Sequence, residues 1–172
     1  MTQPDLTPKR GADSRVTLTQ MMEVTDANVA GNVHGGVIMR LVDTAAALAA
    51  IRHAGGLAVT VSLDEMSFLE PVHIGDVLVL HASVNDVGTT SMECGVRVEA
   101  ENPISGRRLH AASAYLVFVA VDGEGHPRPV PPLVAESEIE QRRQREAKLR
   151  RQTRMGHKEA LKAARAAERS AG

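Results

Sequence analysis

The sequence predicts an α+β fold in which one long helix packs against a curved antiparallel sheet. Three observations support this. One stretch of helical periodicity follows the first strand, four strand-like runs come after it without a second helix between them, and short turns join those runs. At 172 residues, with 43% hydrophobic and 24% charged residues, the chain fits one globular domain with an appendage.

The helix is expected over residues 35–53. Val37, Leu41 and Leu48 recur at helical spacing, and Gly55 with Gly56 ends the pattern. The alanine-rich run at residues 45–50 gives this helix a slim surface, so a curved sheet can approach it closely. A sheet wrapped around a single helix is the hot-dog arrangement.

Alternating apolar and polar residues predict the strands. The apolar parity changes near Asp64 and Glu65, which indicates a β-bulge. Cys94 lies on the apolar parity of its run, so we expect a small core residue and not a nucleophile. The last run is apolar on both faces for most of its length and is expected inside the sheet. The expected strands cover residues 15–24, 57–69, 77–87, 90–101 and 107–121.

The charge divides the chain into a body and a tail. Residues 1–140 contain 9 Lys/Arg and 18 Asp/Glu, whereas residues 141–172 contain 11 and 3. Four prolines within residues 126–132 favour an extended boundary segment. We therefore expect a flexible N-terminus at 1–14, a domain at 15–133 and a charged helical tail at 134–172.

The tail is rich in strong helix formers, and Gly156 is expected to interrupt it. Arg142, Glu146 and Arg150 are spaced for i,i+4 ion pairs, which are typical of a solvated helix. The alternative is a basic arm that binds nucleic acid or an anionic membrane. The tail has no aromatic residue for base stacking, and its apolar stripe is too weak for lipid. We expect neither specific nucleic-acid binding nor membrane insertion.

Composition also excludes several classes of protein. The longest apolar run is too short to span a membrane, and the polar N-terminus has no apolar signal-peptide core. We therefore expect a cytoplasmic protein. Cys94 is the single cysteine, and no Cys/His cluster has zinc-ligand spacing, so neither a disulfide nor a metal is expected.

The glycine-rich segment 26–36 leads from the first strand into the helix. Backbone N–H groups at Gly35 and Gly36 would stand at the positive end of the helix dipole, where they could stabilise an oxyanion. A flexible strand-to-helix turn explains the glycines equally well. His34 alone is no more than a helix-entry residue, because a lone histidine is more often structural than catalytic.

Asp43 lies inside the helix among small residues. It could form an i,i+3 ion pair with Arg40 on an exposed face, or it could be a partly desolvated base facing a substrate cleft. The pattern alone slightly favours the ion pair. Residues 88–91, Gly-Thr-Thr-Ser, are compatible with a plain hairpin turn.

The stretch DANVAGNVHGGVIMRLVDTAA resembles the entry loop and helix of hot-dog acyl-CoA thioesterases, similar to the cytosolic brain-type acyl-CoA hydrolases and the bacterial YciA-like enzymes. VSLDEMSFLEPV, GTTS and VAVDGEGHPRPVPP agree with that family in order and spacing. The resemblance covers residues 15–133 and leaves out the tail. It implies hydrolysis of an acyl-CoA thioester to a free acid and CoA, without a metal or other cofactor.

The resemblance also implies roles for residues. Asn32 and Asp43 match the catalytic pair, with Asp43 as general base or nucleophile, Asn32 positioning water or thioester, and Gly35 or Gly36 holding the carbonyl oxygen. The turn of Gly88, Thr89, Thr90 and Ser91 would contact CoA, with charge from Arg107 or Arg108.

Two alternatives remain. One is a thioesterase of the phenylacetate-pathway type acting on aryl-acyl substrates, and the other is an acyl-CoA-binding regulator without activity. The GTTS and VDGEGHPRPVPP segments favour the acyl-CoA thioesterase described above over the aryl-acyl enzyme. The presence of both Asn32 and Asp43 argues against a protein that only binds acyl-CoA.

Assembly is expected because one helix covers too little of the sheet in a monomer. We expect a homodimer, and the family implies a hexamer formed as a trimer of dimers. Asn32 precedes the helix, and Asp43 lies seven residues beyond Gly36, roughly 10 Å along the axis, so a site shared between two chains is expected.

Overall fold

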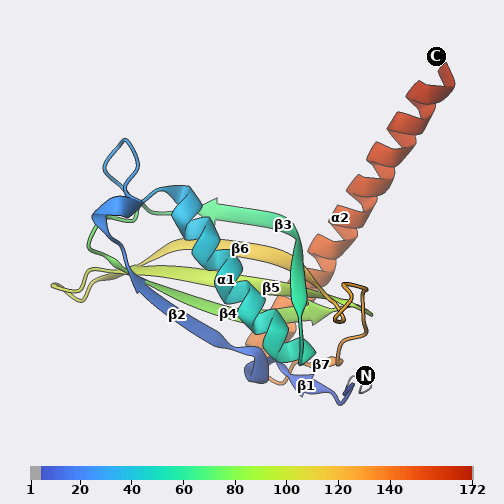
Figure 1. The fold of residues 1–172 in the computed structure, drawn as a ribbon, viewed down its shortest axis with the longest axis horizontal. Helices are drawn as coiled ribbons and strands as arrows, with labels where there is room; N and C mark the ends of the chain where they lie inside the picture. The colour runs from blue at the N-terminus through green and yellow to red at the C-terminus, as the bar shows by residue number, and fades with distance from the viewer. Residues whose placement is uncertain (1–4, 172) are drawn as a thin grey trace.

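The computed structural model describes residues 5–171 and confirms the expected order of elements. Helix α1 (Gly35–Ala54) follows strand β2 (Val16–Met21) and a short 3₁₀ turn, η2 (Val24–Asp26). Four long strands come next, and with β2 they form an antiparallel sheet in the order β2-β4-β5-β6-β3. The strands are β3 (Ala58–Phe68), β4 (Val77–Val87), β5 (Ser91–Glu101) and β6 (Arg108–Ala120). Figure 1 shows α1 crossing one face of this sheet.

Small side chains let α1 lie close to the sheet. Ala45, Ala46, Ala49 and Ala50 are fully buried, so no large side chain separates helix and strands. The helix ends at Gly55, whose φ of 66° is the left-handed conformation that glycine adopts at a helix C-terminus. The fully buried partners on the strands include Leu78, Leu80, Met92, Cys94 and Phe118. The core therefore lies between α1 and the sheet, and Cys94 belongs to it as predicted.

Strand β3 forms one edge of the sheet and contains two irregularities. Its register with β6 shifts between Leu63 and Glu65, which confirms the bulge predicted near Asp64. A second shift, between Thr60 and Ser62, was not predicted. Strand β6 lies inside the sheet as predicted, between β5 and β3. The middle strand of the sheet is β5.

Residues 9–14, which the sequence assigned to a flexible N-terminus at 1–14, form a short strand and a 3₁₀ turn; residues 1–4 lie outside the described residues. Strand β1 (Lys9–Arg10) pairs in parallel with β7 (Leu133–Val134), which crosses the boundary predicted at residue 134. The 3₁₀ turn η1 (Gly11–Ser14) follows, and the fully buried Ser14 hydroxyl accepts a hydrogen bond from Val84 N–H at 3.0 Å. Two-residue strands are too short to give a sequence period.

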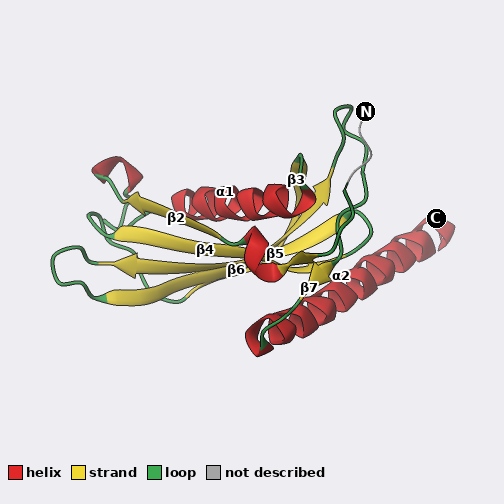
Figure 2. Cartoon of the chain, turned by 90° about the horizontal axis from the view of Figure 1, so that it is seen from below, coloured by secondary structure: helices red, strands yellow, loops and turns green. Residues whose placement is uncertain are grey.

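Helix α2 (Glu138–Ala171) confirms the expected helix in the tail, but it runs through Gly156 without interruption. Figure 2 shows α1 and α2 on opposite faces of the sheet. The first half of α2 is docked and not solvated: Arg150 pairs with Glu93 at 2.6 Å and stacks 3.6 Å from the Tyr115 ring centroid. Arg154 pairs with Asp64, the extra residue of the β3 bulge.

The intrahelical pairs predicted for α2 are therefore half correct. Arg142 binds Glu146 at 2.9 Å, but Arg150 binds the sheet instead of Glu146. Because Glu93 and Asp86 are buried on that outer face, the docked half of α2 compensates charge that the sheet would otherwise bury alone.

Two truncated chains distinguish the contribution of the docked first half of α2 from that of its exposed second half, which begins at residue 156. A chain ending at Met155 keeps both ion pairs and loses residues 156–172, of which 156–169 are exposed. Its midpoint of thermal unfolding should stay within about 3 °C of the full-length value. A chain ending at Val134 leaves Glu93 and Asp64 unpaired and should lose at least about 2 kcal/mol.

Thermal and urea unfolding of the full-length chain and of the two truncated chains measures these differences in stability. Equal stability of the chain ending at Val134 and the full-length chain would contradict a docked α2.

A buried histidine couples the fold to pH. His53 is almost fully buried at the end of α1, its Nε2–H donates to the Pro131 carbonyl at 2.9 Å, and its Nδ1 has no hydrogen-bond partner. Burial is the largest cause that lowers the pKa of His53 below 6.5, and the nearby Lys9 charge lowers it further.

The unfolded chain therefore takes up a proton at this ring before the folded chain does. The free energy of unfolding should fall as the pH drops from about 6.5 toward the folded pKa, by at most about 1.4 kcal/mol per pH unit from this group. Urea unfolding at pH 7.5 and pH 5.5 should show this loss for the wild type. In His53→Gln the loss should be smaller, and an identical pH dependence of both proteins would contradict the assignment.

Candidate active site

The segment before α1 forms a tight loop that contains two asparagines. Asn28 N–H donates to the Asn32 carbonyl at 2.7 Å, and the Asn28 side-chain oxygen accepts from Ala30 N–H and Asn32 N–H at 2.8 and 3.2 Å. Gly31 allows the turn with a φ of 83°. In the part of the chain that is described, neither side-chain amide nitrogen has a hydrogen-bond partner. Both can therefore donate to a ligand.

The entry to α1 presents one free N–H group where two were expected. His34 caps the helix, and its Nδ1 accepts from Gly36 N–H at 2.9 Å. Gly35 N–H has no hydrogen-bond partner within residues 5–171. Its Cα lies against Phe68, whose ring would be 3.4 Å from a Cβ at that position. The geometry therefore favours Gly35 over Gly36 as the donor to an oxyanion.

Asp43 is oriented by a strand and not by its helical neighbour. The Thr60 hydroxyl donates to Asp43 Oδ1 at 2.7 Å, which joins α1 to the start of β3. The ion pair with Arg40 is absent from the described residues, so the interpretation of Asp43 as an i,i+3 ion-pair partner of Arg40 is wrong. The backbone carbonyl of Arg40 accepts a hydrogen bond from the Thr44 hydroxyl at 2.9 Å. One carboxylate oxygen is thus held, and no hydrogen bond of the described chain engages the other.

Thr60 was not identified from the sequence. It lies 17 residues after Asp43 on another element, and no local pattern relates the two. Only the packing of α1 on β3 brings them together.

The expected CoA-contacting residues are separated by the structure. Gly88, Thr89, Thr90 and Ser91 form the turn between β4 and β5, but Arg107 and Arg108 lie at the far end of β5 and β6. Eleven residues of β5 place about 35 Å between the two ends. Arg108 pairs there with Glu101 at 2.7 Å. Within one chain, neither arginine serves this turn.

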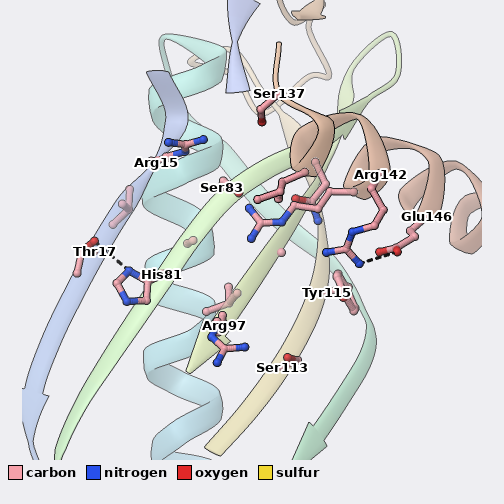
Figure 3. Close-up of a pocket in the computed structure, with 17 residues that line it drawn as sticks. Arg15, Thr17, His81, Ser83, Arg97, Ser113, Tyr115, Ser137, Arg142 and Glu146 are labelled. Atoms are coloured by element: carbon pink, nitrogen blue, oxygen red, sulfur yellow. Dashed lines mark hydrogen bonds and ion pairs between the residues drawn. The ribbon is translucent and has the colours of Figure 1, made fainter. Parts of the chain in front are cut away.

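A separate hollow lies away from Asp43. A groove of about 480 Å³ lies between the outer sheet face and the start of α2, as Figure 3 shows. Three of its arginines already pair with carboxylates: Arg15 with Glu140, Arg97 with Glu99, and Arg142 with Glu146. Asp43 and Thr60 are not among its lining residues. The groove is therefore distinct from the candidate site.

Apolar side chains remain exposed beside the candidate site. Val59, Val61 and Phe68 on the edge strand β3 are about half exposed, as are Met39 and Leu48 on α1. Such a surface on an unpaired sheet edge is typical of an interface or an apolar binding site.

Residues 5–171 offer neither a metal site, nor a membrane-spanning helix, nor a reactive thiol. No group of three or more His, Cys, Asp or Glu residues there could hold a metal ion. No helix of that part is long and apolar enough to cross a membrane. Burial raises the pKa of the Cys94 thiol, so it is no nucleophile.

Comparison with known proteins places this geometry in a family. Residues 30–106 match the model of the thioesterase superfamily. The acyl-CoA thioester hydrolase YkhA of Bacillus subtilis, an uncharacterized protein, is 39% identical over 128 residues, which is 74% of either chain. The cytosolic acyl coenzyme A thioester hydrolase of mouse is 36% identical over 91% of this chain, but the match spans only 43% of the mouse protein.

Solved structures agree in fold. The acyl-CoA hydrolase of Staphylococcus aureus, in complex with butyryl-CoA, CoA and CoA disulfide, has a TM-score of 0.84 and 33% identity, covering 91% of this chain and 95% of its own. A hexameric acyl-CoA thioesterase has a TM-score of 0.85 and 34% identity, covering 88% of this chain and 97% of its own. The hot-dog fold expected from the sequence is thereby confirmed.

The S. aureus enzyme has also been solved as three alanine variants, Asn28→Ala, Asp43→Ala and Thr60→Ala in its own numbering. The present chain has asparagine, aspartate and threonine at the same three numbers. Two of these residues, Asp43 and Thr60, share the hydrogen bond described above.

The match to the superfamily model, the identity to the named relatives and the shared fold agree with one another. This chain belongs to the acyl-CoA thioester hydrolases of the hot-dog thioesterase superfamily.

Proposed function

We propose that this protein hydrolyses acyl-CoA thioesters to a free acid and CoA, with Asp43 as the reacting carboxylate. The observation that carries the proposal is the Thr60–Asp43 hydrogen bond, formed by two of the three residue types altered in the S. aureus enzyme. The hydroxyl fixes one carboxylate oxygen and leaves the other to act. No metal or cofactor takes part in this chemistry.

Asp43 either removes a proton from an attacking water or attacks the thioester carbonyl itself. In both cases negative charge develops on the carbonyl oxygen as the bond to sulfur breaks. The N–H of Gly35 at the start of α1 is suited to stabilise that charge, because the helix dipole favours an anion there. Gly36 N–H would serve only if His34 released it.

The asparagine of the pair comes from the loop at residues 28–32. Asn32 was expected from the sequence resemblance, whereas Asn28 has the number of the asparagine altered in the S. aureus enzyme. Both lie at the base of one loop with free amide N–H groups. We favour Asn28, and variants of both residues distinguish them.

A homodimer completes the site. Gly35 and Asp43 are eight positions apart on α1, about 12 Å along its axis, so the loop before the helix does not reach Asp43 along its own chain. Joining the exposed β3 edges of two chains would pair unsatisfied backbone groups and cover Val59 and Val61. A trimer of such dimers would match the hexameric relatives. Arg107 or Arg108 could reach a Gly88–Ser91 turn only in another subunit.

A thiol-release assay over acyl-CoAs of increasing chain length, with phenylacetyl-CoA included, tests the substrate class. Release from aliphatic acyl-CoAs at higher kcat/KM than from phenylacetyl-CoA supports the proposal. A strong preference for phenylacetyl-CoA indicates an aryl-acyl enzyme, and CoA binding without thiol release indicates a regulator. A cytoplasmic location is part of the same proposal, in agreement with the name of the mouse relative.

A further inference from the structure

Helix α2 presents a row of arginines to the sheet, and one of them, Arg151, forms no close ion pair with a carboxylate of the described residues. Ala147, Arg150, Arg151 and Arg154 lie at helical spacing on the docked side, with Ala147 fully buried. Arg150 and Arg154 each hold a carboxylate, which fixes the rotation and height of the helix. Arg151 forms no ion pair or hydrogen bond within residues 5–171.

The Arg151 guanidinium lies on the turn between β4 and β5. A Cβ at Gly88 would be 2.5 Å from Arg151 Nη2 and 2.9 Å from Nη1, so the guanidinium occupies the space that a side chain at this position would take. Ser91 borders the same small hollow as Arg151, with Asp86 and Glu93 nearby. Of those carboxylates, Glu93 is held by Arg150. Asp86 forms no ion pair with Arg151; burial raises the pKa of Asp86, and the nearby charges of Lys148 and Arg151 lower it to a smaller extent. Arg151 therefore supplies half-buried positive charge at the turn.

The turn adds hydrogen-bond donors to that charge. The carbonyls of Thr89 and Thr90 accept from Val130 and Ala120 N–H groups, which holds the turn in place. The N–H groups and hydroxyls of both threonines have no hydrogen-bond partner in the described chain. Free N–H and hydroxyl donors beside a guanidinium are the groups that bind phosphate oxygens.

The turn also has the right place relative to Asp43. Thr60, which holds Asp43, is paired with Phe118 on β6, and Phe118 is paired with Met92 at the start of β5. Two strand spacings, about 10 Å, thus separate Thr60 from the end of the turn. The pantetheine arm of CoA spans such a distance between thioester and phosphates.

We propose that Arg151 of α2 binds a phosphate of the CoA moiety at the Gly88–Ser91 turn, so the basic tail is part of the substrate site. This inference rests on the proposed acyl-CoA hydrolysis. The sequence resemblance ended at residue 133 and gave the tail no role.

The test compares acyl-CoA with the matching S-acylpantetheine, which has the same thioester but no phosphate. Arg151→Ala should raise KM for acyl-CoA about tenfold, with kcat within twofold and no change for S-acylpantetheine. The effect should shrink at high salt, and Arg151→Lys should recover part of the affinity. Arg145→Ala, on an exposed side of α2, is the control with the same loss of charge.

If Arg151→Ala has the same KM for acyl-CoA as Arg145→Ala, the inference is overturned. An equal rise in the KM of Arg151→Ala for acyl-CoA and for S-acylpantetheine would also overturn it, because that result indicates a merely structural role. If the wild type hydrolyses neither substrate, the proposed function fails and the inference is tested by calorimetric titration with CoA alone. Wild type must then bind CoA about tenfold more tightly than Arg151→Ala. Absent or equal binding by the two proteins would overturn it.

Discussion

Replacing Asp43 with asparagine should lower kcat by about 10² to 10⁴ while the fold and CoA affinity stay close to wild type. The substitution keeps the shape of the side chain, and its amide oxygen can still accept the Thr60 hydroxyl. It removes the negative charge that either accepts a proton or attacks the thioester, which accounts for an effect of that size.

Steady-state kinetics with CoA binding by calorimetry measure both properties. Arg40→Gln is the matched control, because Arg40 lies one helical turn away and forms no ion pair or hydrogen bond with Asp43 among the described residues. It should retain turnover. A kcat of Asp43→Asn within a few-fold of the wild type would remove Asp43 from the mechanism.

Mixed dimers of two inactive variants should recover roughly a quarter of wild-type activity. Asp43→Ala is co-expressed with Asn28→Ala, and separately with Asn32→Ala. Random pairing makes half of the dimers mixed, and a site shared between chains leaves one of two sites intact in each mixed dimer. The asparagine that acts is the one whose alanine variant is inactive alone and recovers about a quarter of the activity when mixed with Asp43→Ala, and we expect Asn28. An asparagine without a role leaves its own variant active before mixing.

A site built from one chain predicts a different result. Each site then lacks one residue in every combination, and activity stays at the level of the single variants. Because the Asn28 side chain also holds the loop through Ala30 N–H and Asn32 N–H, Asn28→Asp is the control that keeps an acceptor and loses the amide donor. Its inactivity would assign the loss to the amide group and not to the loop.

The sequence predicts the body of this fold well, because each element there has a one-sided pattern. The alternation in β5, the alanine run of α1 and the glycine at its end depend only on local burial and backbone conformation. The parity change at Asp64 likewise located the bulge. Asp43 lies within such an element, so its position followed from the same pattern.

Features that depend on contacts between distant segments could not be predicted in this way. The docked side of α2 contains Arg150 and Arg154 instead of apolar residues, so nothing in its sequence distinguishes docking from solvation. Thr60 reaches Asp43 only through the packing of β3 on α1. Asn28 and Asn32 lie in one loop, and local sequence gave no reason to prefer Asn28.

The most direct test of the account measures the two products of one reaction. Purified protein is incubated with an aliphatic acyl-CoA in the presence of EDTA, and free CoA and free acid are quantified together. We predict equal amounts of both, at a rate unaffected by the chelator and lost in Asp43→Asn. A protein that binds CoA but releases neither product, or that needs a metal ion to do so, would contradict acyl-CoA hydrolysis by Asp43.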